Sequence, residues 1–227
     1  MLQNIQAVTF DVGGTLIRPW PSVGHVYGEV AARHGYSNVK PEILNERFSA
    51  AWRAKRNFDH SRRAWLELVK QSFVGSLDEA AVQIFFDELY EQFAAPAAWR
   101  IFDDVRPTLD MLRKRGMKLA VISNWDERLR PLLAGLGLSE FFEPIVVSVE
   151  VGFAKPSRQI FERAVSLLGM PARFIIHVGD SFAEDVTGAA AAGLHGILID
   201  RTASRSDGES IRALAELFQQ RATGRDK

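Results

Sequence analysis

A stretch near the start of the chain holds the first side chain that could do chemistry. An apolar, β-branched run over residues 5–10 leads into Asp11, and Gly13, Gly14 and Thr15 then turn the chain. This pattern predicts a buried strand that ends in a tight loop. The glycines would let backbone groups approach a ligand where a Cβ would interfere. Asp11 is therefore a site candidate, although a turn or helix-capping aspartate is the plainer interpretation of Asp11 alone.

Three later apolar runs also lead into polar side chains. These side chains are Ser123 with Asn124, Lys155 in a loop after its run, and Asp180 with Asp185. Any one of these groups alone also fits a helix cap or an exposed surface residue. In an open parallel sheet, however, ligands bind outside the carboxyl ends of the strands. We therefore expect these groups to gather with Asp11 at one edge of a sheet.

Together these groups match the needs of phosphoryl chemistry. They supply a carboxylate nucleophile, hydroxyl and amide donors, one cation, and two further acids that could hold Mg²⁺. A phosphoryl group carries several negative charges, so its transfer requires a hard divalent cation with oxygen ligands and positive or N–H donors around its oxygens. A carboxylate can attack phosphorus and form an aspartyl phosphate, which divides one difficult step into two.

The elements that must position these groups follow from hydrophobic periodicity. From about residue 95 onward, segments of helical and strand pattern alternate, which implies right-handed crossovers and a parallel sheet covered on both faces. The expected fold class is therefore α/β, with a Rossmann-like parallel sheet. The expected strands cover residues 117–123, 144–149, 173–178 and 195–200, and the expected helices cover residues 105–115, 126–136, 156–168 and 183–192.

A long stretch of helical periodicity separates the first strand from the rest of the sheet. Helices are expected over residues 23–34, 41–56, 62–73 and 78–93, with no convincing strand between Leu16 and Trp99. We therefore expect an all-helical cap domain, residues 17–95, inserted into a core of residues 1–16 and 96–227. Apolar side chains such as Phe48 and Trp65 fall on helix faces, which favours a role in the cap's own core.

Composition excludes several classes of function. The 227 residues include 28 Lys plus Arg and 28 Asp plus Glu, so no net charge favours nucleic acid or a membrane surface. The absence of cysteine excludes disulfides, thiolate catalysis and cysteine metal sites. The chain has no apolar run long enough to span a bilayer and shows no secretory leader. A cytoplasmic monomer or homodimer that binds neither nucleic acid nor membrane is the expectation.

The polar groups form an ordered set that resembles the four motifs of the haloacid dehalogenase-like (HAD) hydrolase superfamily. The resemblance runs from Val8 to about Arg201, and the helical stretch lies where members of that superfamily carry a helical cap. Each motif alone would be a poor signal, whereas the ordered set is specific. The motifs are Asp11-Val12-Gly13-Gly14-Thr15-Leu16, Ile122-Ser123-Asn124, Lys155-Pro156 and Gly179-Asp180-Ser181-Phe182-Ala183-Glu184-Asp185.

The resemblance implies a magnesium site at one end of the sheet. Asp11 would be both the nucleophile and a Mg²⁺ ligand, and the backbone carbonyl of Gly13 and the carboxylate of Asp180 would be further ligands. Asp185 would support the metal or its bound waters.

The resemblance also implies roles in holding the substrate. Ser123 and the neighbouring backbone of Asn124 would hold the phosphoryl oxygens. Lys155 would neutralise charge on the nucleophile and the phosphate, and Thr15 would brace the nucleophile loop.

One position departs from the pattern of the family. Its phosphatases usually carry a second aspartate two residues after the nucleophile, which protonates the leaving oxygen and later activates water, but Gly13 stands there. Glycine keeps the backbone carbonyl but lacks the general acid and base, whose catalysis is typically worth ~10²–10⁴-fold. Asp126 and Glu184 lie near the motifs and could substitute. A helix N-terminal acid and a solvated helix residue are the plainer interpretations of those two.

Three functions remain open from the sequence. The first is a Mg²⁺-dependent phosphatase for a small phosphorylated metabolite, which is slow, selective for good leaving groups, or rescued by another acid. The second is a haloacid dehalogenase, whose halide leaves without a proton. Such dehalogenases usually have tyrosine at the position of Gly13 and use no metal, so the pair Asp180 and Asp185 argues against this function. The third is a non-catalytic protein that binds a phosphorylated ligand or a protein partner.

The expected cap would choose the substrate, because the core edge supplies only generic phosphoryl chemistry. Its most basic run could grip an anionic substrate, although a charged exposed face is the plainer interpretation. A variant that cleaves phosphonates would need a cap lysine for a Schiff base, and Lys40, Lys55 and Lys70 are more simply solvated helix lysines. The run comprises Arg53, Lys55, Arg56, His60, Arg62 and Arg63.

Overall fold

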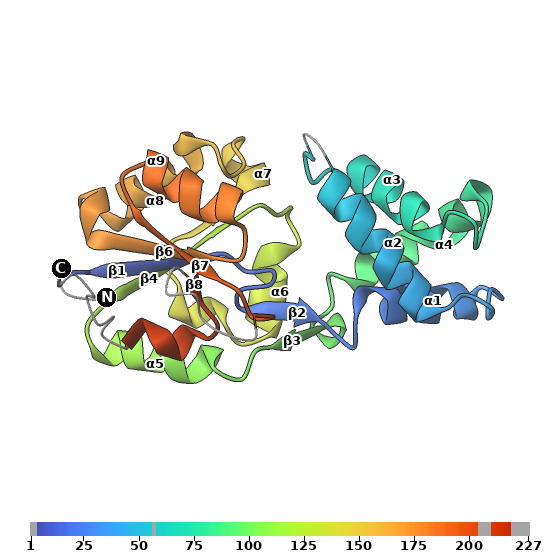
Figure 1. Ribbon diagram of the computed structural model, residues 1–227, viewed down its shortest axis with the longest axis horizontal. Coiled ribbons are helices and arrows are strands. Elements are labelled where there is room, and N and C mark those ends of the chain that lie inside the picture. The colour runs from blue at the N-terminus through green and yellow to red at the C-terminus, as the bar shows by residue number, and fades with distance from the viewer. Residues whose placement is uncertain (1–3, 56–57, 204–209, 219–227) are drawn as a thin grey trace, which may run out of the picture. The chain divides into compact units, whose positions relative to one another are not determined.

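The computed structural model describes residues 4–55, 58–203 and 210–218, and these divide into two compact units (Figure 1). The core unit comprises Met1–Ile17, Ile101–Asn124 and Leu138–Lys227. The helical unit comprises Arg18–Arg100 and Trp125–Gly137. Residues 125–137, which the expected boundaries placed with the core, therefore group with the helices. Arg56, in the basic run, lies outside the described residues.

The core unit contains a six-stranded parallel sheet with strand order β5-β4-β1-β6-β7-β8. The central strand β1 pairs with β4 on one side and β6 on the other, so that Val8 lies opposite Leu119 and Ile176. All four residues of β1 are buried, as expected for a parallel strand covered on both faces. The strands are β1 Ala7–Phe10, β4 Lys118–Ser123, β5 Ile145–Val147, β6 Ile175–Gly179, β7 His195–Ile199 and β8 Ser210–Ile211.

Helices cover both faces of this sheet, which confirms the predicted α/β fold. In Figure 1, α5 (Val105–Lys114) lies on one face, and α8 (Arg158–Leu168) and α9 (Gly188–Ala191) lie on the other. The short helix α7 covers Ser148–Val151. Apolar side chains recur at helical spacing on the inner faces, and on α8 these are Ile160, Phe161, Ala164 and Leu168.

The helical unit has an apolar core of its own. Tyr27 stacks on Phe73 with ring centroids 5.8 Å apart, and Leu44, Phe85 and Leu89 are buried around them. Three helices start at polar side chains that accept a backbone N–H, which explains why their starts could be predicted within one residue. The helices are α1 Val23–Arg33, α2 Pro41–Ala54, α3 Arg62–Phe73, α4 Glu79–Gln92 and α6 Leu129–Gly135.

The structure corrects several predicted elements. The expectation of no strand between Leu16 and Trp99 is wrong, because β2 (Ile17–Pro19) pairs with β3 (Trp99–Ile101). Three residues are too few to show an alternating pattern. The edge strand β8 lies beyond the last predicted strand, and the helix expected from residue 126 begins at Leu129.

Other differences concern short helical turns. The helix expected over residues 183–192 is a π-helical segment, Phe182–Thr187, followed by α9. A π-helical turn has i→i+5 hydrogen bonds and usually occurs within an α-helix, so the apolar pattern of six residues does not distinguish the two. The 3₁₀ turns are Pro96–Ala98, Ser139–Phe141, Ala172–Phe174 and Leu214–Phe218.

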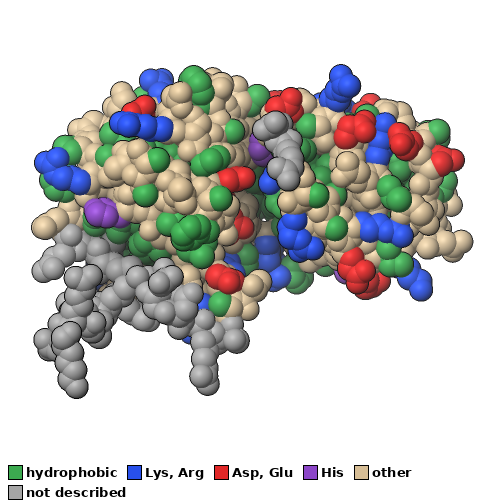
Figure 2. Space-filling model, turned by 45° about the horizontal axis from the view of Figure 1, so that its top comes forward, with side chains coloured by type: hydrophobic (Ala, Val, Ile, Leu, Met, Phe, Trp, Pro, Cys, Tyr) green, Lys and Arg blue, Asp and Glu red, His purple; other side chains and the backbone are tan. Residues whose placement is uncertain are grey.

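Within the described ranges, no helix combines the length and the apolar character needed to cross a membrane. On the face shown in Figure 2, acidic and basic side chains are interspersed, in keeping with the zero net charge of the sequence.

Candidate active site

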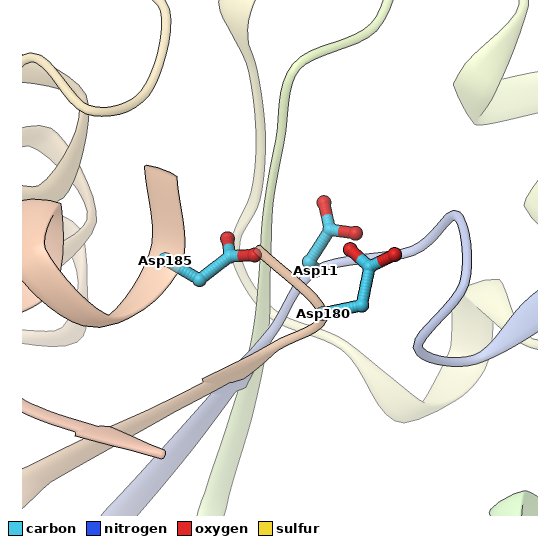
Figure 3. A group of neighbouring side chains, drawn as sticks. All are labelled: Asp11, Asp180 and Asp185. Carbon is cyan, nitrogen blue, oxygen red and sulfur yellow. The ribbon is translucent and has the colours of Figure 1, made fainter. Parts of the chain in front are cut away.

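Three aspartates from different segments of the core unit face a common space (Figure 3). Asp11 follows β1, Asp180 follows β6, and Asp185 lies in the π-helical segment. Each offers a carboxylate oxygen within 4.8 Å of the oxygens of the other two. Because β1 and β6 are neighbours, their carboxyl ends bring Asp11 and Asp180 side by side.

Lys155 joins two of these aspartates. Its Nζ lies 2.7 Å from Asp11 Oδ1 and 2.6 Å from Asp185 Oδ1, and only 4% of the residue is exposed. Burial opposes the charge, but the carboxylates of Asp11 and Asp185 raise the pKa of Lys155 above its ordinary value. Lys155 is therefore a permanent cation between the two acids at neutral pH.

The two oxygens of Asp11 have different surroundings. Oδ1 accepts hydrogen bonds from the Ser123 hydroxyl at 2.9 Å and from Lys155. No described residue donates a hydrogen bond to Oδ2. Burial and the neighbouring Asp185 raise the pKa of Asp11, while Lys155 lowers it. Asp11 thus keeps lone pairs that no protein donor occupies.

The pKa values of the other two aspartates diverge. Burial and the charges of Asp11 and Asp185 raise the pKa of Asp180 to about 7. Burial would also raise the pKa of Asp185, but the Lys155 charge and a hydrogen bond from His177 hold it well below its usual range. When all are ionised, three carboxylates and one ammonium carry a net charge of −2. A divalent cation would neutralise this cluster.

Two glycines leave room for the acids. A Cβ on Gly14 would overlap the carboxylate of Asp180, and the backbone of Gly14 has a positive φ of +74° that disfavours other residues. A Cβ on Gly179 would likewise overlap Asp185. Gly13 is not among the glycines with positive φ. Close approach and a positive φ thus both favour glycine at position 14.

Asn124 holds the loop that carries Lys155. Its Oδ1 accepts from the Lys155 backbone N–H at 2.6 Å, and its Nδ2 donates to the Lys155 carbonyl at 3.0 Å and to Glu184 Oε2 at 3.1 Å. The two N–H bonds of the amide are therefore both used. The sequence predicted the amide as a donor to substrate and the nearby backbone as a phosphoryl contact, whereas the structure has the amide clamp the loop of Lys155.

Thr15 is braced through its backbone. Its carbonyl oxygen accepts from Arg201 Nε at 3.0 Å and Nη2 at 2.6 Å, and Arg201 Nη1 also donates to Asp104 at 3.0 Å. The Thr15 hydroxyl is buried and has no hydrogen-bond partner among the described residues. Sequence reasoning missed Arg201, since nothing in the local pattern links residues 15 and 201.

Neither alternative acid is a free carboxyl group. Asp126 lies in the helical unit with 1% of its surface exposed, and its oxygens accept from Arg128 at 2.9 and 2.6 Å and from Trp65 Nε1 at 3.1 Å. Asp126 precedes the first residue of α6 by three positions, and its Oδ1 accepts from the Arg128 backbone N–H at 3.1 Å, so it stabilises the turn that leads into that helix. Glu184 is half-buried and accepts from Asn124.

Arg62, in the basic run of the helical unit, is paired at the surface. It donates to Asp87 at 2.8 Å and lies 3.5 Å from Glu91. This pairing fits a charged exposed face, the plainer interpretation of that run.

Sequence reasoning also assigned no role to His177. This residue lies fully buried on β6 opposite Thr9 of β1, and its Nε2 is 3.0 Å from Asp185 Oδ1. The available signal was the presence of two polar residues in the middle of otherwise apolar strands, each shortly before a motif aspartate.

A family model and a sequence relative both match most of this chain, and they agree on the family. A family model described as haloacid dehalogenase-like hydrolase matches residues 5–193. Haloacid dehalogenase-like hydrolase domain-containing protein 3 of Homo sapiens is 37% identical over 207 residues, covering 86% of this chain and 82% of that protein.

Two solved structures are similar over nearly the whole chain. A HAD phosphatase from Thermococcus onnurineus has a TM-score of 0.66 and 26% identity, covering 94% of this chain and 96% of its own. A 2-haloacid dehalogenase from Pseudomonas syringae pv. Tomato DC3000 has a TM-score of 0.61, with the same identity and coverage. A phosphatase and a dehalogenase are thus both similar in structure to this chain.

Proposed function

Because this chain belongs to the haloacid dehalogenase-like hydrolase family, we propose that it is a Mg²⁺-dependent phosphatase that acts through an aspartyl phosphate. Its substrate is a small phosphorylated compound. The observation that carries the proposal is the gathering of three carboxylates around one point, next to a buried ammonium group. Displacement of a halide by a carboxylate needs no such concentration of acids.

The donor set fits a magnesium ion. Mg²⁺ prefers oxygen ligands and is usually bound through one or two carboxylates, with waters and substrate phosphates in its other positions. Asp11, Asp180 and Asp185 would hold it, with the Gly13 carbonyl as a further ligand, and its charge would offset the net charge of −2. A bound Mg²⁺ would stabilise negative charge on the phosphoryl oxygens.

The proposed reaction consists of two successive displacements at phosphorus, to which different side chains contribute. The Asp11 carboxylate attacks phosphorus, and the bond from phosphorus to the leaving oxygen breaks as the aspartyl phosphate forms. The Ser123 hydroxyl and the Lys155 ammonium donate to the other charged oxygens. Water then attacks phosphorus, its proton passes to the departing inorganic phosphate or to solvent, and the bond from phosphorus to the Asp11 oxygen breaks, which regenerates the carboxylate.

Proton supply limits the first displacement. Gly13 offers no proton to the leaving oxygen, and Asp126 accepts hydrogen bonds from Arg128 and Trp65. The leaving group must therefore depart as an anion. Compounds whose leaving groups are stable anions, such as acyl and aryl phosphates, should be turned over faster than alkyl phosphates.

Restoring an acid at position 13 tests this explanation. We expect Mg²⁺-dependent release of phosphate from acetyl phosphate and slower release from glycerol phosphate. Gly13→Asp should accelerate the alkyl phosphate by ~10²–10⁴-fold and the acyl phosphate less, because activation of water serves both substrates but only the alkyl leaving group needs the proton. The matched control is Gly13→Asn, which has the same shape but no acid. Phosphate release is measured with and without Mg²⁺.

Two results would count against the phosphatase. Metal-independent release of chloride from 2-chloropropionate, without release of phosphate, would favour a dehalogenase. A rise in melting temperature with phosphorylated ligands, without turnover of any, would favour a binding protein.

We expect the affinity for Mg²⁺ to fall as the pH falls below about 7. Asp180, whose pKa is about 7 in the metal-free protein, must lose its proton before it can bind a cation. The apparent dissociation constant should rise up to about tenfold for each pH unit below that value and level off above it. Calorimetry in two buffers with different ionisation enthalpies measures the affinity and the protons released. An unchanged affinity across this range, with no proton release, would contradict the assignment of Asp180.

A further inference from the structure

A chain of polar groups lies buried behind the candidate active site. Thr9 on β1 and His177 on β6 are directly opposite one another in the register, and neither has any exposed surface. Thr9 Oγ1 is 2.8 Å from His177 Nδ1, and His177 Nε2 is 3.0 Å from Asp185 Oδ1. The chain thus runs from the middle of the sheet to one of the three aspartates.

The partners of Asp185 decide which nitrogen of the ring carries a proton. Asp185 Oδ1 already accepts from the Lys155 ammonium at 2.6 Å, so it belongs to an ionised carboxylate, which cannot donate. If His177 Nε2 had no proton, its lone pair would face the lone pairs of this oxygen at 3.0 Å, and the two atoms would repel each other. Nε2 therefore carries a hydrogen and donates to Asp185.

The neighbouring acceptors determine where the Thr9 hydroxyl donates its proton. The His177 ring is fully buried, and the only described hydrogen-bond partner of its Nδ1 is the Thr9 hydroxyl at 2.8 Å. Thr9 has a single hydroxyl proton, and the Ile176 carbonyl at 3.2 Å is a more distant acceptor than Nδ1 at 2.8 Å. Thr9 therefore donates to Nδ1 and selects the tautomer that has its proton on Nε2.

Packing holds both the ring and the carboxylate. The Phe161 ring meets the His177 ring edge to face, with centroids 5.2 Å apart. The second oxygen of Asp185 accepts from the Ser181 backbone N–H at 2.9 Å, so three donors surround this carboxylate. His177 is the one side-chain donor among them that does not also contact Asp11.

We propose that His177, oriented by Thr9, is a positioning residue that fixes the Asp185 carboxylate and, through it, the Lys155 ammonium against Asp11. The consequence for turnover rests on the proposed function, whereas the hydrogen-bond assignment does not. Without this donor, the buried Asp185 carboxylate turns to recover a partner and Lys155 moves with it. The substrate touches neither His177 nor Thr9, so kcat should change more than KM.

Matched substitutions separate the donor from the volume of the side chain. His177→Leu removes the donor, whereas His177→Gln places an amide N–H near the position of Nε2. Thr9→Val removes the hydroxyl at nearly constant shape, and Thr9→Ser keeps it. We expect His177→Leu to lower kcat about 10- to 100-fold with little change in KM, and His177→Gln to recover most of the loss. Thr9→Val should fall between them, and Thr9→Ser should match the parent.

A measurement on the metal-free protein tests the assignment without any turnover. The ring ¹⁵N spectrum of His177 in the parent protein should show a protonated Nε2 and an unprotonated Nδ1. A proton on Nδ1 alone would overturn the proposal, because Nε2 could not then donate to Asp185. This result is independent of whether the parent protein hydrolyses any phosphate.

Turnover supplies the second criterion. An unchanged kcat in His177→Leu, or equal losses in His177→Leu and His177→Gln, would also overturn the proposal. If the leucine variant does not fold, the comparison of Thr9→Val with Thr9→Ser decides. Lack of turnover by the parent, together with the expected ¹⁵N spectrum, would refute the phosphatase and keep the hydrogen-bond assignment.

Discussion

Replacing Asp11 with asparagine should lower phosphate release by about 10⁴-fold or more. The amide keeps the size of the side chain but cannot attack phosphorus as a carboxylate does. Lys155 retains Asp185 as a partner, so the substitution should leave the fold intact. Steady-state assays on the parent and the variant measure the loss, and circular dichroism checks the fold.

Trapping the intermediate makes the same prediction more specific. Acid quenching of the parent during turnover should yield a peptide that contains Asp11 and carries one phosphoryl group, and the asparagine variant should yield none. Asp110→Asn, a change at an exposed acid on α5, is the matched control and should keep full activity. More than about 1% residual activity in Asp11→Asn with the same Mg²⁺ dependence would place the nucleophile elsewhere.

Replacing Lys155 with methionine should remove activity and also destabilise the protein. The substitution leaves Asp11 and Asp185 buried without the cation that lies between them. Removing one partner of a buried ion pair typically costs about 3–5 kcal/mol of the free energy of unfolding. Lys70→Met is the control, because Lys70 pairs with the exposed carboxylates of Glu67 and Glu79 and should cost about 1 kcal/mol or less.

The loss in the Lys155 variant should shrink at low pH. Without the ammonium, the pKa values of the two buried carboxyls rise above those of the unfolded chain, so the folded state binds protons more tightly. The free energy of unfolding of the variant therefore rises as pH falls from about 8 to 5, relative to the parent. Denaturant unfolding in chelator measures the difference. An equal loss at both pH values would show that lost packing, not charge, is responsible.

Local signals explain the parts of the fold that could be predicted. The helix α3 was predicted at both ends, because Ser61 caps its start and the apolar spacing continues to Phe73. The four residues of β1 form a continuous apolar run that fits only a buried element. Such features depend on neighbours within a few residues, and a sequence displays them directly.

Other parts of the fold depend on pairing between distant residues. The ribbon of β2 and β3 joins segments some eighty residues apart, and neither strand is long enough to be recognised alone. The grouping of residues 125–137 with the helices includes the packing of Pro96 against Gly135. The local sequence of each segment does not indicate which distant segment it packs against.

The candidate site likewise has features that the sequence predicts and features that depend on distant residues. Residue types and their order along the chain indicated Asp11, Lys155 and Asp180 as a set, because each follows a predicted strand. The hydrogen bonds that the individual atoms of the site form could not be predicted from the sequence. The clamp formed by Asn124 and the backbone support of Thr15 by Arg201 are set by distances across the folded sheet.

The central place of β1 also has a consequence for synthesis of the chain. Ala7 pairs with Lys118 on one side and with Ile175 on the other, so the strand that leads to Asp11 is synthesised before both of its neighbours and pairs with the second of them late. Until then, an apolar segment has two unpaired edges, a state prone to aggregation. Loop closure over such separations is slow. The nascent chain should therefore depend on chaperones until β6, which ends at Gly179, has emerged from the ribosome.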